Sequence, residues 1–303
     1  RQNTTSPTNT YRLPPWVNMI TTIVLSRDRP AQLHLLLESL EKNGGNLFET
    51  IVLYEYSNDE FEQGYKNCQN HFYESRKWDF RFPIRWKERR HATITEDLLE
   101  VTSYSRELIC LFNDENILFN SLPSYRTIKE LFNYYSLSAL SLRVGNNTVI
   151  QNPYENADYF AEIPQEGEFV MGKFLIWNAT DVKQYTNFGM PFSSNGHIYH
   201  QNVIKNIFEV SEVEYIDDIE ESIQKKLYSG HFQGRVPPLM SCLEYSAVIH
   251  NSIKKVMDSG VNGLGIDMSD INKRYLDGKK IDYESFDFQH ISMPFEEFPA
   301  RFL

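Results

Sequence analysis

The stretch MITTIVLSRDRPAQLHLLLESL, residues 19–40, joins an apolar run to a leucine-rich run through a short polar loop. Residues 19–26 are β-branched and apolar up to an abrupt polar stop, which is typical of a strand buried on both faces of a parallel sheet. Pro30 suits the first turn of a helix, and the leucines after it recur at helical spacing until Asn43 and two glycines. The stretch therefore predicts a strand, a loop and a helix in direct succession.

The same order is repeated along the next eighty residues. Further strands are expected over residues 50–56, 80–86 and 107–112, with helices after the first two, ending near residue 71 and covering 96–101. This alternation predicts an α/β fold with an open, mostly parallel, doubly wound sheet and flanking helices. Ligands of such sheets bind beyond the carboxyl ends of the strands, so we expect a site at the loops 26–30, 55–59 and 113–116.

The second half of the chain has a more mixed pattern. Helices are expected near residues 124–135, 198–210 and 219–228, strands near 139–144 and 169–177, and either state over 239–249. We expect residues 1–16 to be a disordered lead-in, residues 17–235 to form the binding and catalytic domain, and residues 236–303 to form a C-terminal, partly helical extension packed on it.

Composition narrows the classes of function. A length of 303 residues with 41% hydrophobic side chains allows a sizeable core. The net charge of −11 argues against broad binding of nucleic acid or anionic membranes, which both need a surplus of positive charge. Three widely spaced cysteines favour a reducing compartment, and no apolar run reaches the ~20 residues that span a bilayer. We therefore expect a cytoplasmic protein, free or peripheral to a membrane.

The segment FNDENILF, residues 112–119, places oxygen-bearing side chains directly after the buried strand 107–112. Such oxygens can coordinate Mg²⁺ or Mn²⁺, which in turn bridges the phosphates of a nucleotide. An ordinary polar loop is the alternative, because Asn and Asp also favour strand ends and helix caps. The position at the fourth strand end favours the metal.

The first strand, the loop SRDRP, the second strand ending in an acid and the strand ending in NDEN together resemble the nucleotide-sugar-binding half of the GT-A glycosyltransferases, above all their family-2-like group. The resemblance covers most of the chain. It implies that Ser26, Arg27 and Asp28 lie against the nucleotide and that Glu55 contacts its base.

The resemblance also implies a metal site. Asp114 and Asn116, with Glu115 between them, match a D-x-D-type element that holds Mn²⁺ or Mg²⁺. Further on, MPFSSNGHIYH (residues 190–200) and INKRYLDGKKID (residues 271–282) are similar to segments of uncharacterised bacterial glycosyltransferase-like proteins.

Three positions depart from the family pattern. Glu55 stands where Asp is usual, Asn116 replaces the second acid of the D-x-D element, and Asn195 stands where the related segment has Asp. An amide oxygen can ligate a metal, but an amide supplies no negative charge and cannot act as a general base. A binding protein of the same fold that has lost turnover therefore stands beside the enzyme as an alternative.

Two basic segments can face the phosphates. His197 and His200 open an expected helix and would share one face, from which they can reach a metal or diphosphate, although histidines there are often caps or packing groups. Arg90, in the run Arg89-Arg90-His91, can meet the phosphates or lie on a solvated face.

Acceptor and catalytic residues are less defined by the sequence. Phe192 belongs to an aromatic stripe that can either stack on an acceptor sugar or plug the core, and Asn195 lies close by. Glu166 and Glu168, before the expected strand at 169, are the candidates for a general base.

These features predict a metal-dependent glycosyltransferase. Its partners would be a nucleotide-diphosphate sugar donor and a glycan or other hydroxyl-bearing acceptor. A nucleotidyltransferase, which also uses carboxylate-held Mg²⁺ at a strand end, is a third interpretation. No G-x-S-x-G, P-loop or G-x-G-x-x-G motif follows any expected strand, which argues against serine hydrolases, P-loop NTPases and dinucleotide dehydrogenases.

Overall fold

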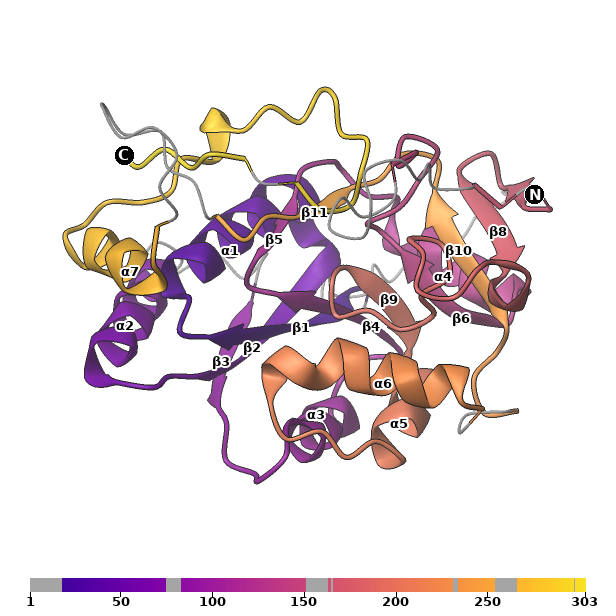
Figure 1. Ribbon diagram of the computed structural model, residues 1–303, viewed down its shortest axis with the longest axis horizontal. Helices are drawn as coiled ribbons and strands as arrows, with labels where there is room; N and C mark the ends of the chain where they lie inside the picture. The colour runs from indigo at the N-terminus through magenta and orange to yellow at the C-terminus, as the bar shows by residue number, and fades with distance from the viewer. Residues whose placement is uncertain are drawn as a thin grey trace, which may run out of the picture.

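Within the residues that the structure describes, nine strands form one central sheet. Figure 1 shows how this sheet runs through the molecule. The computed structural model describes residues 18–74, 83–150, 163–164, 166–230, 234–253, 266–296 and 298–303. In sheet order the strands are β3 (Ile84–Glu88), β2 (Phe48–Glu55), β1 (Ile20–Arg27), β4 (Leu108–Asn113), β9 (His197–His200), β6 (Leu137–Ser141), β10 (Leu239–Leu243), β8 (Phe174–Asn178) and β7 (Glu168–Val170). All of them except β8 and β9 run in the same direction, so the sheet is mostly parallel.

Helices cover both faces of this sheet (Figure 1). They are α1 (Pro30–Gly44), α2 (Asp59–Glu74), α3 (Ile94–Ser103), α4 (Tyr125–Tyr134), α5 (Gln201–Glu209), α6 (Ile219–Tyr228) and α7 (Met268–Leu276). One apolar core joins the sheet to α1, α2, α4 and α7, and a second joins it to α3, α5 and α6. The predicted open, doubly wound α/β sheet with flanking helices is confirmed.

The central strand β1 brings the expected loops to one edge of the sheet. It pairs in parallel with β2 on one side and with β4 on the other, and seven of its eight residues are buried. Arg27 is in register with Glu55, and Leu25 is in register with Asn113. The carboxyl ends of these three strands therefore meet at one place, as the strand order requires.

One expected helix begins later than its pattern predicts. Residues 198–210 were expected to be helical, but β9 occupies His197–His200 and α5 begins only at Gln201. β9 lies between β4 and β6 and pairs with both, and Ile198 and Tyr199 belong to opposite cores. Pairing within the sheet has overridden the local helical signal, and it places the His197 and His200 side chains differently from the shared helix face that was expected.

The later segments divide into short strands. The apolar segment near 169–177 is a hairpin of β7 and β8, and Met171 and Gly172 both have positive φ at its turn. Residues 239–249 contain β10 and also β11 (Val248–His250), which pairs with β5 (Asn116–Leu118). Because β10 lies inside the central sheet, residues after 236 supply a strand before the chain leaves the sheet; the domain boundary at this position stays a prediction.

The C-terminal segment returns across α1 and α2. α7 packs on both helices, and Phe286, Phe288 and Phe298 form an aromatic cluster next to Phe119. The expected lead-in, residues 1–16, lies outside the described residues. Of the helices in the described ranges, none has both the length and the apolar character needed to cross a membrane.

Candidate active site

A cavity of about 230 Å³ opens where β1 and β4 end. Its lining includes Arg29, Asp114, Glu115, Asn195, Glu220 and His250. The chain brings these side chains together from the loops after β1 and β4, from the turn before β9, from the first turn of α6 and from β11. A concave site with convergent charged groups at the carboxyl edge of an α/β sheet is the expected location for ligand binding.

Asp114 is the most deeply buried acid of this cavity, with only 3% of its surface exposed. Its Oδ2 accepts a hydrogen bond from the Arg27 backbone N–H at 3.1 Å, and its own N–H donates to the Leu25 carbonyl. Burial raises the pKa of Asp114 to about 7, although the Arg29 guanidinium nearby acts in the opposite direction. A further cation bound beside this carboxylate would therefore stabilise its charged form.

We expect this buried acid to make the ligand-free protein less stable as the pH rises. Asp114 titrates near 3.8 when unfolded and near 7 when folded, so between these values the folded state binds more protons and the free energy of unfolding falls with increasing pH. The variant Asp114→Asn lacks this group. The difference between its melting temperature and that of wild type should therefore shift in favour of the variant from pH 5 to pH 8. The exposed Asp270→Asn is the control, and an equal difference at both pH values would contradict the prediction.

Three arginines surround the strand ends. Arg29 lies 3.2 Å from a Glu115 oxygen and 3.8 to 3.9 Å from oxygens of Asp217 and Asp114. Arg27 contacts Glu55 and Asp217 at 3.6 and 3.4 Å, and Arg89 contacts Glu55 at 2.6 Å. The strand ends therefore carry a network of guanidinium and carboxylate groups, in which an anionic ligand can bind by exchanging partners. Of these groups, Arg29, Asp114, Glu115 and Asp217 line the cavity.

Asn195 connects the end of β4 to α6. Its Oδ1 accepts hydrogen bonds from the side-chain amides of Asn113 at 2.5 Å and Asn116 at 3.0 Å, and its own Nδ2 donates to Glu220 at 2.8 Å. An aspartate at this position could accept the first two bonds but could not donate the third, and it would repel Glu220. The amide at position 195 therefore matches the carboxylate at position 220.

Glu220 is a carboxylate of the cavity that we did not predict from the sequence. Its Oε2 accepts hydrogen bonds from Ser193 Oγ, the Ser194 backbone N–H and Asn195 Nδ2 at 2.7 to 2.9 Å, and from Ser194 Oγ at 3.3 Å. Its Oε1 lies 3.7 Å from Nη1 of Arg143, whose side chain is 2% exposed. Glu220 is thus held in one position by neutral donors and a buried cation, while 21% of its side chain stays exposed.

The turn that places Asn195 depends on Gly196, which has φ of +82° and donates its N–H to the Leu111 carbonyl. An alanine Cβ there would lie 3.0 to 3.1 Å from the Val248 side chain. We expect Gly196→Ala to lower the free energy of unfolding by about 1–3 kcal/mol in urea titration, and by more than Gly278→Ala does, because the new Cβ is strained at this φ and also presses against Val248. Gly278→Ala is the matched control, since Gly278 has φ of +84° and open space around it. An equal loss in both variants would show that contact with Val248 contributes nothing.

The residues predicted to hold the nucleotide lie at this edge of the sheet, each with a partner. Ser26 Oγ is 2.6 Å from the Tyr65 hydroxyl, and Asp28 accepts a hydrogen bond from the Ser57 N–H at 2.7 Å. Glu55 holds Arg27 and Arg89, as described above. Arg90 is exposed and reaches Asp97 through its backbone N–H, so Arg89 is the arginine of that run which faces the strand ends.

The candidate metal ligands are separated by the structure. Asp114 and Glu115 line the cavity, but Asn116 is buried, accepts from the Asn113 N–H and donates to Asn195. His197 is fully buried in β9, and burial lowers its pKa well below the usual value. Of these candidate ligands, Asp114 and Glu115 therefore present oxygens to the cavity, whereas Asn116 stabilises the loop through its hydrogen bonds.

The predicted acceptor and base residues are also separated. Phe192 is fully buried and packs against Tyr199 and Phe208, as the core alternative expects. Glu166 and Glu168 are exposed at β7, the edge strand that lies five strand positions from β4, roughly 24 Å at the usual spacing. From there neither carboxylate reaches the cavity, whereas Glu220 lines it.

The sequence gives only a weak signal for Glu220. It belongs to the acidic run Asp217-Asp218-Ile219-Glu220-Glu221, in which any member can be read as a first-turn residue of a helix. Only the fold distinguishes the members, because it turns Glu220 toward the buried Arg143 and leaves Glu221 exposed. Arg143 likewise carries no motif of its own.

No protein family and no curated protein sequence matches this chain. Among solved structures, it is similar to 4-diphosphocytidyl-2C-methyl-D-erythritol synthase from Anaerococcus prevotii, with 12% identity and a TM-score of 0.38 over 87% of this chain and 98% of that one. CMP:2-keto-3-deoxy-manno-octonic acid synthetase in complex with CTP matches at 12% identity and a TM-score of 0.35. This match covers 86% of the present chain and 99% of the synthetase.

A mannosyltransferase from Pyrobaculum calidifontis in complex with GDP-Man and Mn²⁺ matches at 13% identity and a TM-score of 0.29. This match covers 42% of the present chain and 36% of the mannosyltransferase. At such identities the likeness concerns the fold alone.

Proposed function

We propose that this protein is a metal-dependent glycosyltransferase that moves a sugar from a nucleotide-diphosphate sugar to an acceptor hydroxyl. The observation that carries the proposal is the composition of the 230 Å³ cavity. Asp114, Glu115 and Arg29 lie at the ends of β4 and β1, Asp217 pairs with Arg29, and a separate carboxylate, Glu220, comes from α6. These are the two kinds of group that the reaction needs, one for the leaving diphosphate and one for the acceptor proton.

The donor side suits a divalent metal. Asp114 and Glu115 present carboxylate oxygens, which Mg²⁺ and Mn²⁺ prefer, and the raised pKa of Asp114 shows a buried carboxylate short of positive charge. These two residues would hold the ion through their carboxylate oxygens. When bound, the metal neutralises the charge that develops on the departing diphosphate.

Arginines supply the remaining positive charge. Arg29 would leave Glu115 to contact the diphosphate. Arg27 and Arg89, which pair with Glu55 at the neighbouring strand end, would contact the part of the donor that extends beyond the cavity. Guanidinium groups form paired hydrogen bonds with phosphate oxygens, which fix the leaving group in one orientation.

On the acceptor side, Glu220 removes the proton of the attacking hydroxyl. Its Oε2 is held by the 193–195 turn, so the carboxylate does not need to reorganise during the reaction. As the acceptor oxygen attacks the anomeric carbon, the bond from that carbon to the diphosphate breaks and the hydroxyl proton passes to Glu220. The carboxylate of Glu220, next to Asn195, supports the enzyme over a binding protein that has lost turnover.

A nucleotidyltransferase is the second candidate. Three guanidinium groups at one sheet edge, on Arg27, Arg29 and Arg89, match the larger negative charge of a nucleoside triphosphate as well as that of a diphosphate. The two candidates differ in the product that is released.

Product analysis separates the two functions. The protein is incubated with Mn²⁺ and either a panel of UDP-, GDP-, CMP- and dTDP-sugars or the nucleoside triphosphates with sugar phosphates. The proposal expects release of the nucleotide from one activated sugar and no pyrophosphate from any triphosphate. Release of pyrophosphate would overturn it in favour of nucleotidyl transfer, and Asp114→Asn, with Asp270→Asn as control, links either activity to this cavity.

A further inference from the structure

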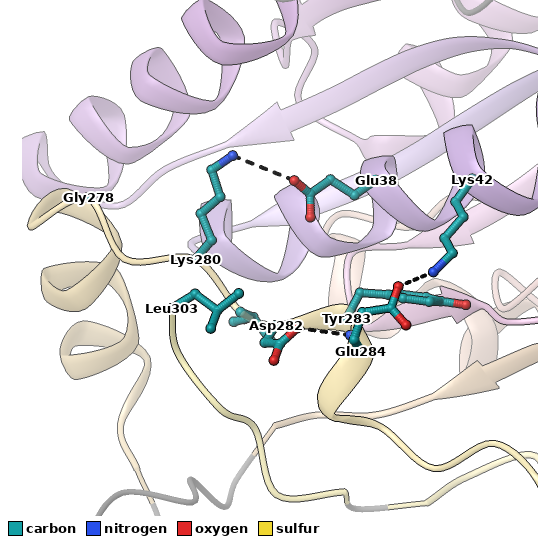
Figure 2. A pocket seen from close by; sticks show the side chains of 9 residues that line it. Glu38, Lys42, Gly278, Lys280, Asp282, Tyr283, Glu284 and Leu303 are labelled. Atoms are coloured by element: carbon teal, nitrogen blue, oxygen red, sulfur yellow. Dashed lines mark hydrogen bonds and ion pairs between the residues drawn. The ribbon is translucent and has the colours of Figure 1, made fainter.

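A second polar cluster lies between α1, α2 and the C-terminal segment, apart from the candidate active site. It borders a cavity of about 420 Å³ whose lining includes Glu38, Lys42, Lys280 and Glu284. Figure 2 shows Lys280 extending from the segment after Gly278 toward Glu38 on α1.

Two histidines and this glutamate converge beside the cavity. His34 and Glu38 lie one turn apart on α1, and His71 comes from α2. One ligand atom of each residue lies within 4.8 Å of those of the others, and His34 Nε2 is 3.0 Å from Glu38 Oε1. An ion bound at about 2.0–2.2 Å in tetrahedral geometry holds its ligands roughly 3.4 Å apart, so small side-chain rotations bring all three into range.

We propose that His34, Glu38 and His71 form a binding site for a Zn²⁺-type ion, with the fourth coordination position open to the 420 Å³ cavity. Two imidazoles and one carboxylate with an open position are a ligand set that suits zinc, whereas Mg²⁺ prefers oxygen ligands alone. The site is independent of the proposed transferase function.

A neighbouring tyrosine orients the most buried ligand. The Tyr275 hydroxyl, from α7, lies 2.7 Å from His34 Nδ1. Without a metal, Nε2–H donates to Glu38 Oε1. Metal binding would shift the proton to Nδ1, whose N–H then donates to the Tyr275 hydroxyl, and would leave the Nε2 lone pair for the ion. Such second partners fix the tautomer and direction of metal-binding histidines, and their loss typically costs 10- to 100-fold in metal affinity.

The Lys280 ammonium group lies close to the proposed position of the ion. Its Nζ lies 3.6 Å from Glu38 Oε1 and 3.4 Å from both ring nitrogens of His71. The lysine side chain is 39% exposed, so it can move into the cavity when a metal ion replaces it. An ammonium and a divalent cation cannot occupy this position together, and Lys280 therefore acts as a competitor of the metal.

Other nearby groups do not complete the ligand set. Cys68 is one turn before His71 on α2, but burial raises the pKa of its thiol to about 12, so it stays protonated. A second group of candidate ligands in the described residues, His91, Asp97 and Glu100, is already engaged, since Asp97 pairs with Arg89 and Glu100 with Lys87.

The test is titration of the whole chain with Zn²⁺, and with Mg²⁺ for comparison, by calorimetry and by the visible absorption of bound Co²⁺. The Asp114→Asn background removes the other metal site. We expect one Zn²⁺ per chain, at least about 10-fold weaker binding in His71→Asn, and tighter binding in Lys280→Met. His290→Asn, at an exposed histidine, should leave the affinity unchanged.

Lys280→Met distinguishes a metal site from a structural ion-pair cluster. If the cluster serves only to hold the C-terminal segment, Lys280→Met lowers the melting temperature and leaves the Zn²⁺ affinity unchanged, which overturns the proposal. Equal Zn²⁺ binding by wild type and His71→Asn, or the absence of Co²⁺ absorption in a folded Lys280→Met variant, overturns it as well. Folding of each variant is checked by circular dichroism.

Discussion

Replacing Asp114 with asparagine is expected to reduce turnover of the nucleotide-sugar donor at least about 100-fold. The amide keeps the shape of the side chain and can still accept from the Arg27 N–H, but it removes the charge that, in our proposal, would hold the metal. Metal stabilisation of a leaving phosphate contributes several kcal/mol, and each 1.36 kcal/mol corresponds to about tenfold in rate. Steady-state release of nucleotide, measured over a range of Mn²⁺ concentrations, gives the effect directly.

The control for this variant is Asp270→Asn, which changes an exposed acid on α7. Its turnover should equal that of wild type. If Asp114→Asn kept full activity at saturating Mn²⁺, Asp114 would have no part in holding the metal, and the donor side of the site would have to be reassigned.

The second large effect is expected for Glu220→Gln. This change should lower kcat by about 100- to 10,000-fold, the usual contribution of a general base, while the affinity for the nucleotide diphosphate stays within a factor of about three. Glutamine retains an acceptor oxygen for the 193–195 turn but cannot take a proton. The KM for the donor and the kcat, measured separately, distinguish loss of the base from loss of donor binding.

The neighbouring residue provides a matched control. Glu221→Gln changes the next acid on the same helix, whose side chain is 71% exposed and pairs with Lys225. It should have wild-type kcat. A kcat of Glu220→Gln within threefold of wild type would show that Glu220 only supports the turn before β9, and equal losses in both variants would point to the stability of α6 instead.

The fold could be predicted well from local patterns. The run 19–26 and the leucines after Pro30 correspond closely to β1 and α1, and the carboxyl ends of β1, β2 and β4 meet where the loops were expected. These elements are buried on both faces or along a regular stripe, so their patterns are local properties of the chain. β9 could not be predicted in this way, because its four residues become a strand only by pairing with β4 and β6.

The site could be predicted only where it follows a strand directly. Asp114 and Glu115 are next to β4 in sequence, and the topology alone places them at the edge of the sheet. Glu220 comes from a helix more than a hundred residues later, and its environment depends on the buried Arg143 and on Asn195. Such a site requires knowledge of tertiary contacts, which no spacing along the chain provides. The only sequence signal at Glu166 and Glu168 is their charge in a loop, and charge alone does not specify where a side chain lies in the fold.

Calorimetric titration with UDP, GDP, CDP and dTDP, each with and without Mn²⁺, shows whether the cavity binds a metal and a nucleotide together. We expect one of these diphosphates to bind wild type, its affinity to fall at least about tenfold when Mn²⁺ is removed, and Asp114→Asn to abolish the Mn²⁺-dependent part. If no diphosphate binds with any metal, or if one binds equally well to wild type and Asp114→Asn, the cavity at the end of β4 is not a metal–nucleotide site.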